Sequence, residues 1–129
     1  MPPKVLVVDD DAVMRSLLRK LLELRPGYAV TDAVDGETGK RLTQADQYSC
    51  IVLDHILPDM TGLDFLRWFR ARDPKTPVVV FTGFGDETLA VDMMKAGAND
   101  YVSKVGFSAE RFLAAVRDAV QATNQEVRA

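Results

Sequence analysis

Short apolar runs alternate with longer amphipathic segments along the whole chain. Residues 5–8 form an unbroken apolar run, and apolar residues then recur at helical spacing from Val13 to Leu24. This succession continues to a last helical face that carries Phe112, Val116 and Val120. It predicts strands at residues 5–8, 28–31, 50–53, 77–81 and 101–102. It also predicts helices at residues 13–24, 37–45, 63–72 and 87–96, and a final helix capped by Ser108.

The predicted strands are apolar on both faces, which is typical of a parallel sheet covered by helices on both sides. Parallel strands need right-handed crossover connections, and the amphipathic segments supply them. We therefore expect an α/β fold, a doubly wound parallel sheet of five strands. A single domain is expected over residues 1–129, with its core at about residues 4–122 and a polar C-terminal tail that either extends the last helix or frays.

The charge, the cysteine count and the length of the apolar runs exclude several classes of function. The formal net charge is −3, so the chain lacks the basic excess of a nucleic-acid-binding surface, and we expect no direct nucleic-acid contact. Cys50 is the only cysteine, which excludes an internal disulfide and a cysteine-based zinc site. No apolar stretch has the length of a membrane span or a signal peptide. We expect a cytoplasmic location without membrane contact.

Polar residues that could bind an ion or take part in a reaction follow four of the predicted strands. These are Asp9, Asp10 and Asp11, then Asp54, Thr82 and Lys104. In open α/β sheets, ligands bind beyond the carboxyl ends of the strands, so these side chains should converge. Clustered carboxylates raise one another's pKa or recruit a cation, and an oxygen-only donor set favours Mg²⁺. The set indicates Mg²⁺-assisted phosphoryl chemistry with a carboxylate nucleophile, whereas the alternative is that the aspartates only cap the following helices.

The chain also resembles the receiver domain of bacterial two-component response regulators, from about Lys4 to about Val120. The matching stretches are VLVVDDD, IVLDHILPDMTGLDFL, PVVVFTG and AGANDYVSK, in that order. The resemblance implies a flavodoxin-like (βα)5 fold with strand order 2-1-3-4-5.

By this resemblance, Asp54 is the phosphoacceptor, which takes a phosphoryl group from a phosphohistidine and becomes an acyl phosphate. Asp10 is implied as a direct Mg²⁺ ligand and Asp9 as one that acts mainly through water. Asp54 itself and the backbone carbonyl of Ile56 complete the implied protein ligands.

The remaining implied roles concern the phosphoryl group and the output of the domain. Lys104 forms a salt bridge to the phosphoryl group, and Thr82 donates a hydrogen bond to it. Tyr101 changes rotamer with Thr82 and switches a partner-binding face built by the fourth helix, the fifth strand and the fifth helix. The implied partners are a sensor histidine kinase or a phosphotransfer protein, and a downstream effector protein or domain. The oligomeric state stays open, a homodimer included.

Several positions qualify the resemblance. Val105 follows Lys104 where the family usually has proline after a cis peptide bond, so we expect a trans or a strained bond here and an altered geometry of the Lys104 loop, with remodelling for a partner as an alternative. Ile56 and Phe84 are apolar and flank the path of an attacking water, and we hypothesise that they slow hydrolysis of the acyl phosphate. His55 should point away from its neighbour Asp54 and be exposed, because successive side chains of a strand alternate.

Two rival interpretations remain open. VLVVDDDAV also fits the pattern of haloacid-dehalogenase-like phosphatases, with Asp9 as nucleophile and Asp11 as acid and base. A receiver-shaped interaction module that is never phosphorylated is the other. For a receiver, we expect Asp11 to cap the first helix, and the sharper alternative is that it adds negative potential for the metal.

Overall fold

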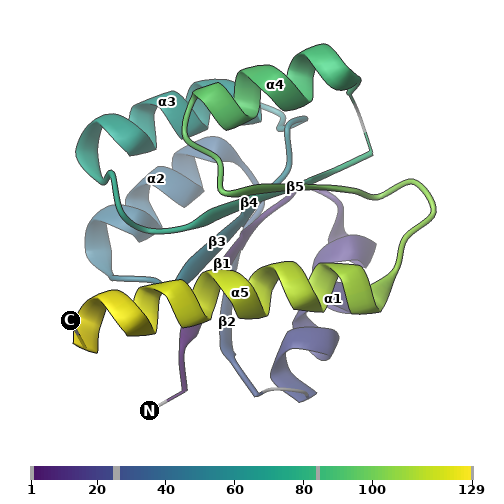
Figure 1. The fold of residues 1–129 in the computed structure, drawn as a ribbon. Coiled ribbons are helices and arrows are strands. Elements are labelled where there is room, and N and C mark those ends of the chain that lie inside the picture. The colour runs from purple at the N-terminus through teal and green to yellow at the C-terminus, as the bar shows by residue number, and fades with distance from the viewer. Residues whose placement is uncertain (1, 25–26, 84, 129) are drawn as a thin grey trace.

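The computed structural model describes residues 2–24, 27–83 and 85–128, in which five strands alternate with five helices (Figure 1). The strands are β1 (Lys4–Val8), β2 (Ala29–Ala33), β3 (Cys50–Leu53), β4 (Val78–Thr82) and β5 (Asp100–Ser103). The helices are α1 (Ala12–Leu24), α2 (Gly36–Ala45), α3 (Gly62–Arg72), α4 (Glu87–Lys95) and α5 (Ala109–Arg128).

All five strands are parallel neighbours in one sheet, in the order β2-β1-β3-β4-β5. This confirms the predicted doubly wound fold and the strand order that the resemblance implied. Because the strands are parallel, their carboxyl ends lie at one edge of the sheet. The central strand β3 is flanked by β1 and β4, so residues after these three strands are close neighbours at that edge.

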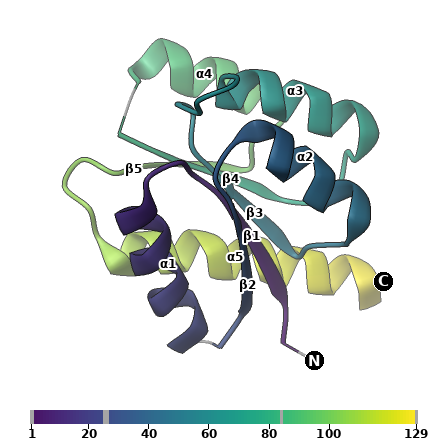
Figure 2. The ribbon, with the colours of Figure 1, turned by 180° about the vertical axis from the view of Figure 1, so that it is seen from behind.

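Helices cover both faces of the sheet, with α1 and α5 on one side and α2, α3 and α4 on the other (Figures 1 and 2). Successive side chains of a strand point alternately into two hydrophobic cores, one on each face of the sheet. In β1, Val5 and Val7 face the core under α1 and α5, whereas Leu6 and Val8 face the core under the other three helices. This burial on both faces explains the unbroken apolar runs of the strands.

Four of the five strands differ from their predicted bounds by one or two residues at an end, and β2 and β5 show the reason. The second was predicted at residues 28–31 and the fifth at residues 101–102, but β2 ends at Ala33 and β5 spans Asp100–Ser103. Backbone pairing extends past the apolar letters, because ladder hydrogen bonds do not require apolar side chains. The C-terminal tail extends the last helix to Arg128, which was one of its two expected states.

Side-chain caps fix the starts of most helices. Asp35 accepts from the amide of Thr38, Thr61 from Asp64 and Asp86 from Leu89, each at 2.8–3.1 Å. Ser108 accepts from the Arg111 amide at 3.2 Å, which confirms the predicted cap of the last helix. Such caps satisfy amides that have no partner inside the helix.

Cys50 is completely buried, and burial raises the pKa of its thiol to about 12. It is therefore an inert part of the core, as a cysteine within a buried strand should be. Among the described residues, no helix has both the length and the apolar character needed to cross a bilayer.

The core under α5 generates a stability prediction. Phe81 is fully buried, and its ring centroid lies 5.0 Å from that of Phe112 and 5.7 Å from that of Phe107. Phe81→Ala should lower the free energy of unfolding by about 3–5 kcal/mol, because it leaves a cavity in a packed core. Urea unfolding followed by circular dichroism measures this. Val13→Ala, at an 80% exposed position, is the control and should change stability by less than about 0.5 kcal/mol; equal effects would contradict the assigned core.

Candidate functional site

The backbone ladder brings three of the predicted site residues to one edge of the sheet. The amide of Asp9 donates to Ala33 at 3.0 Å, that of Asp54 to Val8 at 3.0 Å, and that of Lys104 to Thr82 at 2.9 Å. Each residue is thus fixed by a bond at the carboxyl end of a strand. Their side chains start from well-determined positions because the sheet beneath them is rigid.

A buried ion-pair network joins these side chains. The Nζ of Lys104 lies 2.7 Å from Oδ2 of Asp9 and 3.1 Å from Oδ2 of Asp54. Asp9 is 2% exposed and Asp54 6% exposed. The other oxygen of Asp9 accepts from the amide of Asp11 at 2.9 Å. One ammonium therefore serves two buried carboxylates.

Burial and ion pairing shift the pKa values of Asp9 and Lys104. Desolvation raises the pKa of Asp9 above its ordinary value, although the hydrogen bond from Lys104 opposes the rise. Burial works against the charge of Lys104, but its bond to Asp9 and the negative charges of Asp9 and Asp54 outweigh this and raise the pKa of Lys104. By formal charge, two buried carboxylates face a single ammonium here.

Asp10 completes the cluster that was predicted at this edge. Carboxylate oxygens of Asp9, Asp10 and Asp54 all lie within 4.8 Å of one another. Asp10 is exposed, so the cluster opens toward solvent. Its donors are all hard oxygens, and a small divalent cation such as Mg²⁺ or Ca²⁺ fits such a set. An excess of buried negative charge beside one ammonium is a second reason why a cation fits here.

Asp11 has a different task. Its Oδ1 accepts from the amides of Val13 at 3.0 Å and Met14 at 3.2 Å, at the start of α1. The prediction that Asp11 caps the first helix is confirmed. Its exposed carboxylate is engaged with backbone amides, which disfavours the role of acid and base in the phosphatase interpretation.

Arg15 contacts the backbone of Asp9, which the sequence did not predict. Its Nη1 donates to the backbone carbonyl of Asp9 at 2.8 Å, and its Nε lies 3.7 Å from Asp32. The side chain is only 16% exposed. Arg15 therefore holds the backbone behind the cluster. The sequence gives no sign of the contact between Arg15 and the Asp9 carbonyl, because that contact depends on how α1 packs against the sheet.

Thr82 and Tyr101 line one cavity of about 270 Å³ between the β4–α4 loop and β5. Thr82 is buried, and Tyr101 packs partly buried against the core under α3 and α4. A Cβ at Gly85 would collide with the Tyr101 hydroxyl, so the ring lies along the β4–α4 loop. The two residues predicted as a switch are thus neighbours.

His55 corrects one prediction. It was expected to be exposed, but it is 8% exposed. The β3–α3 loop folds back on itself, with Ile56 bridging to Thr61 and the Gly62 amide donating to the His55 carbonyl at 2.7 Å. Strand alternation does not continue into this closed turn, and the turn shields His55.

Three further loop positions were singled out in the sequence: Ile56, Phe84 and Val105. The side chain of Ile56 is 46% exposed at the edge of the sheet, and Phe84 lies outside the described residues. Val105 is 75% exposed, and its amide donates to Ser103 Oγ at 3.0 Å, a bond that proline could not make. Lys104 reaches both aspartates with this loop, so the absence of proline does not displace it.

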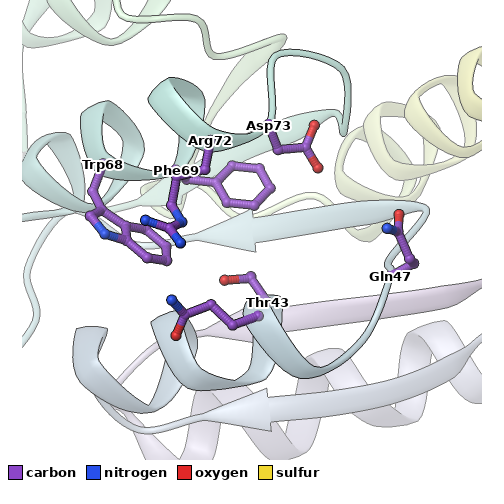
Figure 3. A pocket seen from close by; sticks show the side chains of 7 residues that line it. Thr43, Gln47, Trp68, Phe69, Arg72 and Asp73 are labelled. Carbon is purple, nitrogen blue, oxygen red and sulfur yellow. The ribbon is translucent and has the colours of Figure 1, made fainter.

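A cavity of about 570 Å³ between α2 and α3 is separate from this edge (Figure 3). It is lined by Thr43, Gln44, Gln47, Trp68, Phe69, Arg72 and Asp73. These residues belong to the C-terminal halves of the two helices and the segments that follow, which lie toward the amino ends of the strands. None of the predicted site residues lines it.

Comparison with known proteins identifies the family. The response regulator receiver domain family matches residues 5–117. The chain belongs to this family. The receiver domain is a signalling domain of two-component systems, and neither the phosphatase nor the unphosphorylated module is favoured. The matched region lies inside the core predicted from the sequence, at about residues 4–122.

Named relatives agree. The receiver domain is 35% identical over 126 residues to the response regulator MprA of Mycolicibacterium vanbaalenii, covering 98% of this chain and 54% of the relative. It is 35% identical over 104 residues to the transcriptional regulatory protein SrrA of Staphylococcus aureus, covering 81% of this chain and 42% of the relative. The chain thus spans about half the length of the curated relatives it matches.

Solved structures share the fold. A CheY-like response regulator receiver domain protein from Methanospirillum hungatei superposes with a TM-score of 0.91 at 24% identity, covering 98% of this chain and 99% of the other. The receiver domain of the Francisella response regulator 1452 superposes with a TM-score of 0.86 at 29% identity, covering 94% and 98%.

The ion-pair network generates a pH prediction. Lys104→Gln leaves Asp9 and Asp54 buried without their cation, so in the absence of divalent ions it should cost about 3 kcal/mol of stability at neutral pH. Desolvation raises the pKa of Asp9, and the hydrogen bond and charge of Lys104 hold that rise down. Without Lys104 the pKa of Asp9 rises further, so the variant takes up a proton on Asp9 at a higher pH than wild type does and loses its uncompensated charge. The deficit should therefore shrink as the pH falls toward about 4. Urea unfolding of both proteins across this range measures it, and a deficit that does not change with pH would contradict the assignment.

Proposed function

We propose that this receiver domain accepts a phosphoryl group on Asp54 from the phosphohistidine of a sensor histidine kinase or a phosphotransfer protein. The observation that carries the proposal is the placement of Asp54. Its buried carboxylate lies within reach of the Lys104 ammonium and of two further aspartates at the carboxyl edge of the sheet. An oxygen of Asp54 would attack phosphorus, a P–O bond would form, and the P–N bond would break with its electron pair leaving on the imidazole.

The other groups would stabilise the charge that develops on the phosphoryl oxygens. Asp9, Asp10, Asp54 and the Ile56 carbonyl would hold Mg²⁺, with Asp9 acting mainly through water. When bound, the metal supplies neutralisation of phosphoryl charge. The ammonium of Lys104 would leave Asp9 and form an ion pair with a phosphoryl oxygen. Its two short contacts with Asp9 and Asp54 already place it beside the reacting carboxylate.

A phosphoryl oxygen would then attract the Thr82 hydroxyl, and Tyr101 would follow into the space that Thr82 leaves. Both line the same cavity, which supports this coupling. The readout would be a change on the face of α4, β5 and α5, where Val91 and Met94 are about half exposed. A downstream effector protein or domain would bind there.

The wider setting is also proposed. Both named relatives are regulators that extend well beyond the matched region, so the activity of the whole protein is a separate question. A cytoplasmic location, the absence of direct nucleic-acid contact by this domain, and its extent over residues 1–129 stay predictions from the sequence.

Phosphorylation of Asp54 can be tested with a small phosphoryl donor. Incubation with phosphoramidate and Mg²⁺ should add one phosphoryl group to the wild-type domain, as intact-mass spectrometry detects. Asp54→Asn should abolish the addition, because an amide cannot form the acyl phosphate. Asp11→Asn should retain it, because the Asp11 side chain accepts from backbone amides at the start of α1 and asparagine keeps that acceptor oxygen. Labelling that survives in Asp54→Asn and disappears in Asp9→Asn would favour the phosphatase instead.

Ile56 should affect the lifetime of the acyl phosphate. Its apolar side chain is exposed two residues after Asp54, where it can exclude water from the phosphoryl group. Ile56→Asn should shorten the phosphoryl half-life severalfold, because an amide can position an attacking water. The half-life follows from intact mass against time after donor removal. An unchanged half-life would refute the shielding hypothesis.

A further inference from the structure

Asp59 joins the β3–α3 loop to a helix distant in sequence. Its Oδ1 accepts from the amide of Gly36 at 2.8 Å, and its Oδ2 accepts from the amide of Glu37 at 2.9 Å. Both oxygens of the carboxylate are therefore engaged with the first two residues of α2. A negative charge at the positive end of a helix strengthens both bonds.

Helix α2 already has a cap of its own. Asp35 accepts from the amide of Thr38 at 2.8 Å, one turn into the helix. Asp59 satisfies two further amides that have no partner inside the helix. The two aspartates therefore bind the same helix end, but Asp35 belongs to the helix segment and Asp59 belongs to the loop.

The loop that carries Asp59 is closed. Its two sides pair where Ile56 bridges to Thr61, and the Gly62 amide donates to the His55 carbonyl at 2.7 Å. A Cβ at Gly62 would collide with the backbone of Asp54 and His55, so the base of the loop is packed without spare room. At the tip, Met60 packs directly against Gly36.

This closed loop makes the position of Ile56 depend on the position of the tip. The tip, residues 58–60, rests on α2 through Asp59 and Met60, while the opposite side carries Ile56 two residues after Asp54. Because the bridge between Ile56 and Thr61 couples the two sides of the loop, release of the tip would also loosen the side that carries Ile56.

We propose that Asp59 is a positioning residue that anchors the β3–α3 loop on α2 and thereby sets the affinity of the site for Mg²⁺. The inference rests on the proposed function, because it takes the Ile56 carbonyl as a metal ligand. Removal of residues that orient metal ligands typically weakens metal binding by about 10–100-fold. Since one of several ligands is affected here, we expect a loss near the lower end, about tenfold.

The test is Mg²⁺ titration by isothermal calorimetry on the wild-type chain, Asp59→Ala and the matched control Asp35→Ala. Asp59→Ala should bind Mg²⁺ about tenfold more weakly, whereas Asp35→Ala should bind like wild type, because it loses a helix cap without releasing the loop. Asp59→Asn, which keeps one acceptor, should fall between wild type and Asp59→Ala. Amide hydrogen exchange gives a second readout, in which Ile56 and Leu57 should exchange faster in Asp59→Ala but not in Asp35→Ala.

The outcomes separate the two proposals. If the wild-type chain does not bind Mg²⁺, the metal site proposed above is wrong, and this inference with it. If the wild type binds and Asp59→Ala binds equally well, only the positioning role is overturned. Equal weakening in Asp59→Ala and Asp35→Ala also overturns it, since fraying of α2 would then explain both. Should Asp59→Ala fail to fold, the comparison of Asp59→Asn with wild type decides.

Discussion

The ion pair of Lys104 with Asp9 and Asp54 is the interaction on which the rest of this molecule depends. Two carboxylates buried at the end of a parallel sheet are costly unless a cation compensates them. Lys104, the residue after β5, provides that cation at 2.7 and 3.1 Å. The parallel register makes this possible, because it delivers the ends of β1, β3 and β5 to one edge. With a single lysine beside it, the three-aspartate cluster has an excess of formal negative charge, which suits the divalent cation of the proposed function.

The surroundings of this pair hold it in place without blocking it. Behind it, Arg15 binds the carbonyl of Asp9, and beside it Asp59 fastens the β3–α3 loop to α2. In front, Asp10 is exposed, so the site opens to solvent. Toward β4 and β5, Thr82 and Tyr101 line one cavity, which would give the proposed switch room to rearrange. A firm support on one side and a cavity on the other are consistent with the proposed switch.

Much of the fold and of the site could be predicted from the sequence. Apolar runs on both sheet faces predicted the parallel sheet, and the residues that end the strands predicted the convergence of Asp9, Asp54 and Lys104. What the sequence missed depends on tertiary packing. The burial of His55 follows from a loop that closes on itself, and the contacts of Asp59 join residues 22 and 23 positions apart. No local pattern of charge or periodicity encodes such contacts.

The most direct measurement is a structure of the domain with Mg²⁺ and beryllofluoride, a mimic of the phosphoryl group. The account predicts beryllium bonded to a carboxylate oxygen of Asp54, the metal held by the cluster of Asp9, Asp10 and Asp54, and the Lys104 ammonium moved from Asp9 to a fluorine atom. Beryllofluoride bonded to Asp9, or a metal-loaded site with no adduct on Asp54, would contradict it.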